Sequence, residues 1–176
     1  MNLNLFTQHL PPRLTEALLI MGTKDMEEVR ICAEKNAATL KGGTLMDKCF
    51  DVLYDYALPL RRQIHQYPEV GFETVRTVKL ISDELEKMGI AYTYAYGQGS
   101  VVAELGQGQT LIALRADIDA LPVEEKTDLP FKSKIPGQMH ACGHDSHTAI
   151  LLAVAKYLKE NEKDLNCKIR LIFQPS

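Results

Sequence analysis

Three of the five histidines of this 176-residue chain fall within a short stretch, at His140, His144 and His147. Cys142 lies among them. A thiolate and an imidazole are both good ligands for zinc and similar divalent ions. Gly143 separates Cys142 from His144 and permits a sharp turn, so that both side chains can reach one metal pair. This clustering favours a metal or catalytic site over chance.

The roles of the flanking histidines stay open, because orienting or structural roles explain His140 and His147 as well as metal ligation does. Asp145 stands where the following helix is expected to begin, and we expect its side chain to cap that helix. His65, far upstream, is expected to be structural or to support the ligands from behind.

Two carboxylates form a second constellation after an apolar run at residues 110–114. Asp117 and Asp119 stand two positions apart, and in extended backbone such side chains point to the same face. Ligands and catalytic groups of open α/β sheets gather at the carboxyl ends of strands. The pair is expected to hold a histidine ligand or to lie beside the metal, with two solvated turn carboxylates as the equal alternative.

Helical periodicity dominates the first half of the chain. Apolar residues recur at three- and four-residue steps over residues 26–40, 44–67 and 73–88, which predicts three helices. Pro59 is expected to break or kink the second helix, and Pro68 to end it.

The pattern then changes to short apolar or alternating runs. Residues 91–96, 100–105 and 110–115 predict strands, with a hairpin connection at residues 106–109. A further helix is predicted at residues 145–160 and a last strand at 168–173. Strand, loop, helix and strand in that order form a βαβ unit, so part of the sheet should be parallel. The predicted fold class is therefore α/β, with a mixed, partly parallel sheet flanked by helices.

The composition is ordinary for a globular protein, with 45% hydrophobic and 24% charged residues. A formal net charge of -3 gives no electrostatic footprint for nucleic acid or an anionic membrane, so neither partner is expected. No stretch approaches the length of a membrane span, and the N-terminus lacks a signal-peptide pattern. The four cysteines are expected to be reduced thiols in a cytoplasmic protein that acts on small molecules.

Four motifs recur in the order of one known family: LRRQIH with PEVGFE from residue 60, LRADIDALP from 114, GQMHACGHDSHT from 137 and FQP from 173. Together they resemble the M20 metallopeptidase family, in particular its amidohydrolase branch of N-acyl-amino-acid, hippurate and auxin-conjugate hydrolases. The resemblance covers the chain from about residue 58 to its end, and four ordered motifs are far more specific than one.

The resemblance implies a zinc-peptidase-like catalytic domain whose complete site holds two ions of zinc, manganese or cobalt. Cys142 and His144 match the family's metal-ligand positions. Asp119 matches the acid of the catalytic motif, which reads His-x-Asp in related branches and begins here with Asp117. A metal-activated water then attacks an amide carbonyl of an N-acyl amino acid or a peptide-like substrate, with a glutamate as general base. The resemblance also allows a homodimer of the complete enzyme.

The chain departs from the family pattern at its end. In the family, the general-base glutamate and a glutamate ligand directly follow the Phe-Gln-Pro segment, and two histidine ligands and an inserted lid or dimerisation domain come later. Because the sequence stops at Ser176, we expect an incomplete catalytic domain with little or no activity alone. Residues 46–176 are assigned to its N-terminal portion, and residues 1–45 to a helical N-terminal extension of unknown role.

Two alternatives to an enzyme remain. The chain is then a non-catalytic fragment, or one part of a split enzyme that binds metal weakly or pairs with a complementary chain. A structural zinc module is less favoured, because such modules use four ligands, usually with Cys-x-x-Cys spacing. The remaining cysteines are not spaced in that way: Cys32, Cys49 and Cys167.

Overall fold

The structure is a computed structural model that describes residues 45–175, with side chains described from residue 51. The helix expected at residues 26–40, and residues 1–44 of the predicted N-terminal extension, lie outside these residues. Among the described helices, none combines the length and the apolar character needed to cross a bilayer.

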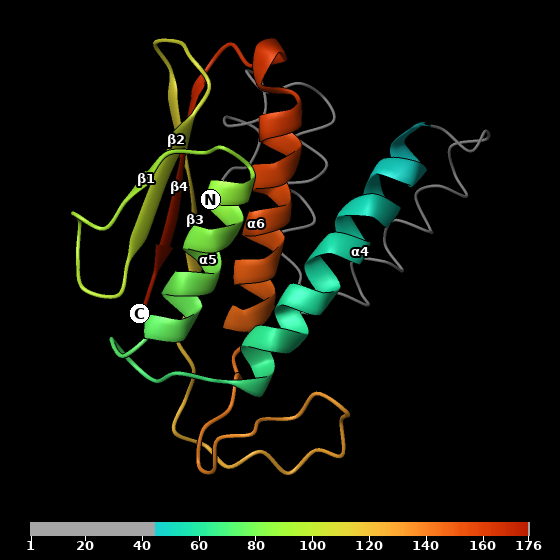
Figure 1. Ribbon diagram of the computed structural model, residues 1–176, viewed down its shortest axis with the longest axis vertical. Coiled ribbons are helices and arrows are strands. Elements are labelled where there is room, and N and C mark those ends of the chain that lie inside the picture. Colours follow the sequence, from blue (N-terminus) through green and yellow to red (C-terminus); the bar gives the residue numbers. More distant parts are fainter. Residues whose placement is uncertain (1–44, 176) are drawn as a thin grey trace, which may run out of the picture.

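The described helices gather on one side of a sheet (Figure 1). Helix α4 spans Leu45–Gln66, α5 spans Val75–Lys87 and α6 spans His144–Glu160, followed by a 3-10 turn η1 at Glu162–Asp164. Helices α5 and α6 pack against the strands, and α4 packs on α6. Each predicted helix within the described residues is confirmed to within a few positions.

Helix α4 is one continuous element that contains Pro59, so the helix does not break there, and the alternative expectation of a kink stays a prediction. A proline removes one helical hydrogen bond and crowds the preceding turn, which usually disfavours the helix interior. Here the surrounding turns are held by packing, because Ala57 is buried against Ala149 and Ala153 of α6. The helix ends at Gln66, just before Pro68, as predicted.

Four strands form one mixed sheet in the order β1-β2-β4-β3. They span Tyr92–Thr93 (β1), Val101–Leu105 (β2), Leu111–Asp117 (β3) and Lys168–Gln174 (β4). Strand β4 pairs parallel to β3 and antiparallel to β2. The predicted βαβ unit, β3–α6–β4, and the α/β fold class are therefore confirmed.

The hairpin expected at residues 106–109 is wrong, because β4 lies between β2 and β3 and pairs with both. The connection instead lies against the start of β4. A Cβ atom at Gly106 would approach the Cys167 carbonyl oxygen to 2.5 Å, and one at Gly108 would approach the Asn166 carbonyl oxygen to 2.4 Å. These glycines therefore allow a close backbone approach rather than a two-strand turn.

The strand expected at residues 91–96 is shorter than predicted and ends at Thr93. The Thr93 hydroxyl accepts a hydrogen bond from the Ala95 backbone N–H at 3.1 Å, which turns the chain away from the sheet. Tyr94 then donates its hydroxyl proton to the Ser82 hydroxyl of α5 at 2.9 Å. A local turn and a helix contact therefore replace the last part of the strand.

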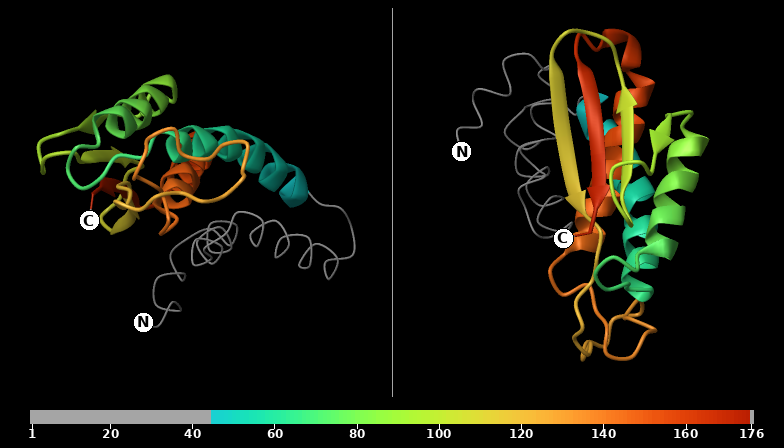
Figure 2. Two further views of the ribbon diagram at one scale, coloured as in Figure 1. Left: turned by 90° about the horizontal axis from the view of Figure 1, so that it is seen from below. Right: turned by 90° about the vertical axis from the view of Figure 1, so that its left-hand side faces the viewer.

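Figure 2 shows the sheet and the helices as adjacent layers, and the hydrophobic core lies between them. On β4, Ile169, Leu171 and Phe173 are fully buried and alternate with partly exposed residues. Leu151 and Leu158 of α6 belong to the same hydrophobic cluster. The central strand is thus fixed by burial on its helix-facing side, which in turn fixes where β3 and α6 meet.

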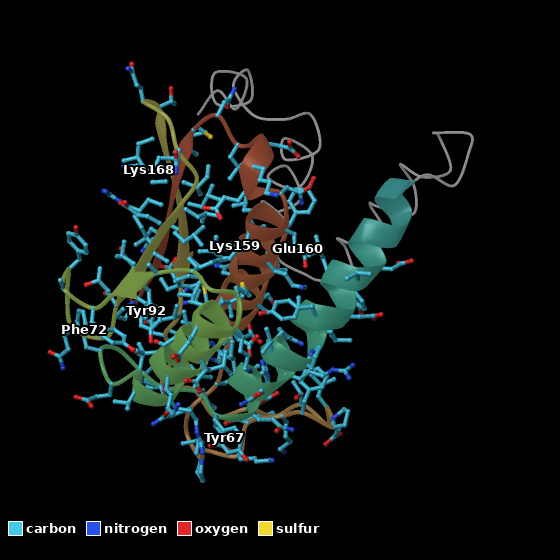
Figure 3. The ribbon with its side chains drawn as sticks, turned by 45° about the horizontal axis from the view of Figure 1, so that its top comes forward. Tyr67, Phe72, Tyr92, Lys159, Glu160 and Lys168 are labelled. Carbon is cyan, nitrogen blue, oxygen red and sulfur yellow. The ribbon has the colours of Figure 1, made fainter. Side chains whose placement is uncertain are left out.

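A long loop (residues 118–143) leaves the carboxyl end of β3 and returns to the first turn of α6 (Figure 1). Its two ends are joined by reciprocal backbone hydrogen bonds of 3.0 Å between Leu121 and Met139. Its far side is tied to the end of α4, where Lys134 N–H donates to the Gln66 carbonyl at 2.8 Å. Lys134 also lies 4.9 Å from the ring of Tyr67, which Figure 3 labels beside this loop.

Glu69 joins the end of α4 to both α5 and the long loop. Its carboxylate accepts hydrogen bonds from the backbone N–H groups of Arg76 (2.9 Å) and Thr77 (2.8 Å), while Thr74 makes no side-chain cap. Its own backbone carbonyl accepts from the Ala120 N–H at 2.7 Å. Glu69 therefore takes the place of the usual N-cap residue.

Replacing Glu69 with alanine should lower the free energy of unfolding by about 1–2 kcal/mol, because two helix N–H groups lose their acceptor. Urea unfolding followed by circular dichroism measures this loss. Glu86→Ala, at an exposed position of the same helix, is the matched control and should change stability by less than about 0.5 kcal/mol. Equal losses in the two variants would contradict the capping role.

Candidate metal centre

The imidazole of His144 is held by the segment that leaves β3. Its Nδ1 lies 2.9 Å from the backbone carbonyl oxygen of Asp119 and 3.2 Å from Oδ1 of the same residue. Both atoms are acceptors, so Nδ1 carries the proton and donates it. The opposite nitrogen, Nε2, then keeps its lone pair, which is the arrangement that metal-ligating histidines usually show.

Asp117, His144 and His147 form a possible ligand group, with one ligand atom of each within 4.8 Å of the others. The two histidines are three positions apart in the first turn of α6, so they share a face, and their rings stack with centroids 5.7 Å apart. Burial and then the nearby His144 lower the pKa of His147, which favours the neutral ring that binds metals. Asp117 is also paired with Arg115.

Cys142 is an exposed free thiol on the turn before α6, and it lies outside this ligand group. Of the three residues predicted to form the site, the structure therefore brings His144 and Asp119 into contact and leaves Cys142 beside them in the chain. The group instead contains Asp117 and His147. For Asp117 the sequence left open whether it supports a ligand or is a solvated turn carboxylate, and for His147 it left open whether the ring binds metal or has an orienting or structural role.

Gly143 begins helix α6 in the left-handed conformation, with φ 83° and ψ 15°. Its carbonyl oxygen accepts hydrogen bonds from the backbone N–H groups of Ser146 (3.0 Å) and His147 (3.1 Å). No side chain caps this helix, so the capping role expected for Asp145 is wrong. The Asp145 carboxylate turns inward instead.

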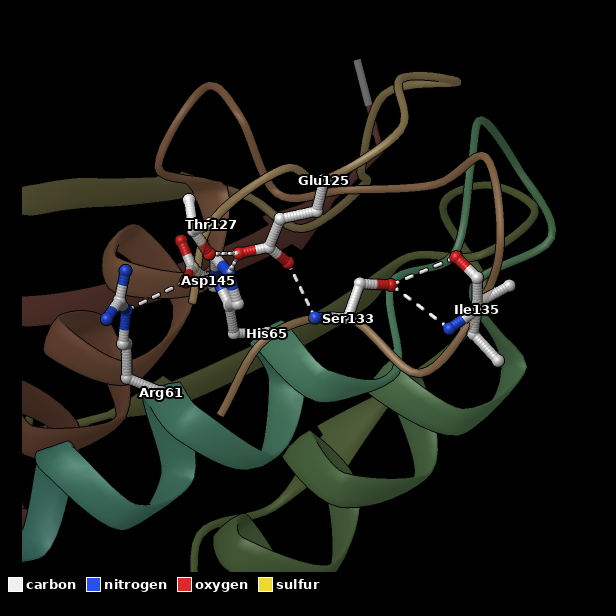
Figure 4. A network of polar contacts seen from close by, with 7 residues as sticks. All are labelled: Arg61, His65, Glu125, Thr127, Ser133, Ile135 and Asp145. Atoms are coloured by element: carbon white, nitrogen blue, oxygen red, sulfur yellow. Dashed lines mark hydrogen bonds and ion pairs between the residues drawn. The ribbon is translucent and has the colours of Figure 1, made fainter. Parts of the chain in front are cut away.

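The Asp145 carboxylate is fully buried in a network of charged side chains (Figure 4). Its Oδ2 lies 2.7 Å from His65 Nδ1 and 2.8 Å from Arg61 Nε. The other imidazole nitrogen, His65 Nε2, lies 3.3 Å from Oε1 of Glu125. Because both partners of this imidazole are carboxylates, both of its nitrogens donate, and the ring is an imidazolium. Two positive and two negative side chains then balance one another.

Burial lowers the pKa of His65, but the hydrogen bond to Asp145 and that carboxylate's charge more than reverse this, so its pKa is raised overall. Burial raises the pKa of Asp145, and the hydrogen bond from His65 and the charge of Arg61 outweigh it, leaving its pKa lowered. The pKa of Glu125 is lowered for the same kind of reason, with the Ser133 and Thr127 hydrogen bonds outweighing burial. The charged form of the network is thus the stable one.

His140 is buried next to this network, and burial lowers its pKa to about 4. Its ring lies 6.3 Å from that of His65, and within the described residues neither ring nitrogen has a hydrogen-bond partner. It is not a member of the possible ligand group. Sequence reasoning missed Glu125 and Arg61. The four-residue spacing of Arg61 and His65 on one helix face was a usable signal, whereas nothing marked Glu125 within the long loop.

Comparison with known proteins shows which family this part of the chain resembles. Residues 113–176 match Peptidase family M20/M25/M40. This part of the chain carries the sequence pattern of peptidase family M20. The match begins within β3 and includes both the possible ligand group and α6.

Relatives and solved structures extend this M20 similarity upstream. The chain is 49% identical over 124 residues to IAA-amino acid hydrolase ILR1-like 4 of Arabidopsis thaliana, which covers 70% of this chain and 28% of that protein. It is 51% identical over 119 residues to N-acetyl-L-cysteine deacetylase of Bacillus subtilis, covering 66% and 29%. The Bacillus subtilis YxeP protein, described as a dinuclear metal binding peptidase from the M20 family, superposes with a TM-score of 0.68 at 41% identity, covering 72% and 36%. The chain thus spans less than a third of the length of these curated relatives and matches their N-terminal part.

Replacing Gly143 with alanine should destabilise the chain by about 1–2 kcal/mol, because a residue with a Cβ is strained in the left-handed region. It should also weaken zinc binding, since His144 follows directly. Gly143→Asn should recover most of both losses, because asparagine adopts this conformation more readily. Urea unfolding and competition with a chromophoric zinc chelator measure the two effects. An asparagine variant as impaired as the alanine variant would argue against a conformational cause.

The charge network should make stability depend on pH in both directions. The raised pKa of His65 means that its contribution is complete below its ordinary value of 6.5 and is lost as the pH rises through the folded-state pKa. The lowered pKa of Glu125 means that its contribution is present above its ordinary value of 4.5 and is lost as the pH falls through the folded-state pKa.

The stability difference between the wild-type chain and Glu125→Gln should therefore be greatest between about pH 5 and 6.5 and decrease on either side. Urea unfolding across the pH range measures it. Glu104→Gln, which alters an exposed pair with Arg170, is the matched control and should give a small difference. A difference for Glu125→Gln that does not vary with pH would contradict the charged network.

Proposed function

We propose that this chain forms part of the metal site of an M20-type hydrolase that cleaves the amide bond of N-acyl amino acids or similar small amides. The observation that carries the proposal is the orientation of His144, whose Nδ1 is fixed on Asp119 while Nε2 is available to an ion. This histidine lies at the carboxyl end of β3, where open α/β sheets place their ligands.

The donor set fits a zinc, manganese or cobalt ion. We propose Cys142 and His144 as ligands, with Asp117 and His147 close enough to contribute. A thiolate with imidazoles favours zinc among these ions. When bound, a pair of such ions polarises the amide carbonyl and lowers the pKa of an attacking water.

Asp119 is proposed to act on the metal through His144. By accepting the Nδ1 proton, its carbonyl and carboxylate oxygens fix the tautomer and the ring orientation, and they raise the basicity of Nε2. The residue is buried, which strengthens this hydrogen bond and limits the motion of the ring. In this role Asp119 is a positioning residue for the ligand, and the family's glutamate base acts on the water.

The substrate class is proposed from the relatives, which are named IAA-amino acid hydrolase ILR1-like 4 and N-acetyl-L-cysteine deacetylase. Both names refer to an amino acid that carries a further group, and we propose that this group is an acyl group. Residues 46–176 would supply the first part of the catalytic domain, and the remaining ligands and the general base would come from residues outside these 176. A homodimer of the complete enzyme and a cytoplasmic location, which suits the free thiols Cys142 and Cys167, belong to the same proposal.

The second candidate is a non-catalytic or split-enzyme role for the 176-residue polypeptide itself. It is favoured if Asp117 and His147 do not contribute, because Cys142 and His144 by themselves hold zinc poorly when catalytic zinc usually has three protein ligands and a water. The isolated chain, supplied with Zn²⁺, Mn²⁺ or Co²⁺, is expected to give no turnover of hippurate or N-acetyl amino acids. Clear turnover would show that these 176 residues already suffice.

The function itself is tested in a chimera in which this chain replaces the matching segment of the Bacillus subtilis deacetylase. The chimera should hydrolyse N-acetyl amino acids in the presence of metal, and Cys142→Ala or His144→Ala should reduce kcat/KM by more than about a hundredfold, since even residues that only orient ligands are worth up to that factor. Kinetics and metal content are measured together.

Cys167→Ala is the matched control. Cys167 is a buried thiol that directly precedes β4, and it lies away from the long loop. It should leave the metal content unchanged. An active chimera whose rate and metal content survive Cys142→Ala would contradict the proposed ligand set, and loss of zinc in Cys167→Ala would favour a structural zinc module.

A further inference from the structure

We propose that His65 is a positioning residue that holds two stretches of the site, one through Asp145 and the other through Glu125. The two contacts are properties of this structure, and only the consequence for metal binding rests on the proposed function. The first contact fixes residues 139–145, which are the end of the long loop and the start of α6 and are called the His-Cys loop below. The second fixes the middle of the long loop, around residues 125–133.

The first contact acts on the residue that directly follows His144, whereas Asp119 contacts the His144 ring. Asp145 directly follows His144, and its carboxylate is fully buried between His65 and Arg61 of α4. The His144 ring is meanwhile held by Asp119. The ring of the proposed ligand is thus fixed by the segment that follows β3, and its backbone is fixed from α4 through Asp145.

Helix α4 is suited to this task because it is rigidly placed. Arg61 and His65 are four positions apart, so they share one helix face. One turn before Arg61, Ala57 is buried against Ala149 and Ala153 of α6, and small residues at such a contact bring the helices close. The loop that precedes α6 is therefore braced by the helix that packs on α6.

The second contact closes the long loop over the buried charges. Glu125 accepts hydrogen bonds from the Thr127 hydroxyl and from the backbone N–H of Ser133, which bends residues 125–133 into a compact turn. Phe131, in this turn, places its ring edge-on to His65 at 5.6 Å and within 5.0 Å of the Arg61 guanidinium. The turn therefore shields the imidazolium from water, and a buried charge is tolerated only when it is paired in this way.

The two hydrogen bonds of His65, to Asp145 and to Glu125, are called its two arms and can be removed one at a time. The amide nitrogen of asparagine occupies the place of imidazole Nδ1, and that of glutamine occupies the place of Nε2. His65→Asn therefore keeps a donor for Asp145 and loses the one for Glu125. His65→Gln does the reverse, so each variant is the matched control of the other.

Residue-resolved hydrogen exchange of the metal-free 176-residue chain reads both arms. The amides of Ser146 and His147, which donate to Gly143, report the His-Cys loop, and the amide of Ser133 reports the Glu125 arm. His65→Gln should accelerate exchange at Ser146 and His147 by about tenfold or more and leave Ser133 near wild type. His65→Asn should do the opposite, since one hydrogen bond to a charged group is lost in each case.

This crossed pattern does not follow from a general loss of stability, which would move all three amides together. Equal acceleration at both places in both variants, or no acceleration in either, would overturn the proposal. If the variants do not fold, the wild-type chain still decides, because ¹⁵N–¹H spectra must show His65 protonated on both nitrogens. A neutral ring with a bare Nδ1 would overturn it as well.

Zinc affinity adds the functional consequence and separates the two proposals. His65→Gln should bind Zn²⁺ at least about tenfold more weakly than His65→Asn, because only the former releases Asp145. Equal affinities with the crossed exchange pattern intact would overturn the link to metal binding. A wild-type chain that binds no zinc, with the exchange pattern intact, would instead contradict the ligands given under the proposed function.

Discussion

The parallel pairing of β3 with β4 is the constraint on which the site depends. Two parallel neighbours require a crossover, and here the crossover is α6, so the carboxyl end of β3 and the first turn of α6 must face each other. That meeting brings Asp117 and Asp119 to His144 and His147. The burial of Ile169, Leu171 and Phe173 fixes β4, and through it the position of both elements.

Buried charge is the second constraint, and it links the site to helix α4. An isolated carboxylate inside a protein is strongly unfavourable, so the buried Asp145 is paired with both Arg61 and His65. His65 is in turn paired with Glu125. Such networks contribute little net stability compared with apolar packing, but breaking one partner leaves an unpaired charge. The arrangement is therefore better explained by the precise placement that it imposes on the residue next to His144.

The sequence predicted the elements whose signals are local. Periodic apolar residues placed α5 and α6 to within a few positions, and the order of strand, loop, helix and strand predicted the parallel pair. The contact of Asp119 with His144 is one of the roles left open for the carboxylate pair, with solvated turn carboxylates as the equal alternative. Prediction was wrong where distant packing decides, because β4 inserts between β2 and β3 and Asp145 turns inward instead of capping α6. At Pro59 the helix continues, which contradicts the break but not the kink that was the alternative. No local sequence pattern could show that Glu125, in the long loop, is the second partner of His65.

The most direct test of the metal centre is zinc K-edge X-ray absorption on the chain loaded with one equivalent of Zn²⁺. The account predicts a sulfur neighbour at about 2.3 Å together with imidazole nitrogen, and loss of the sulfur signal in Cys142→Ala. A zinc ion surrounded only by nitrogen and oxygen at roughly 2.0–2.2 Å, unchanged by that substitution, would contradict it. Binding would then be assigned to Asp117, His144 and His147 without the thiol.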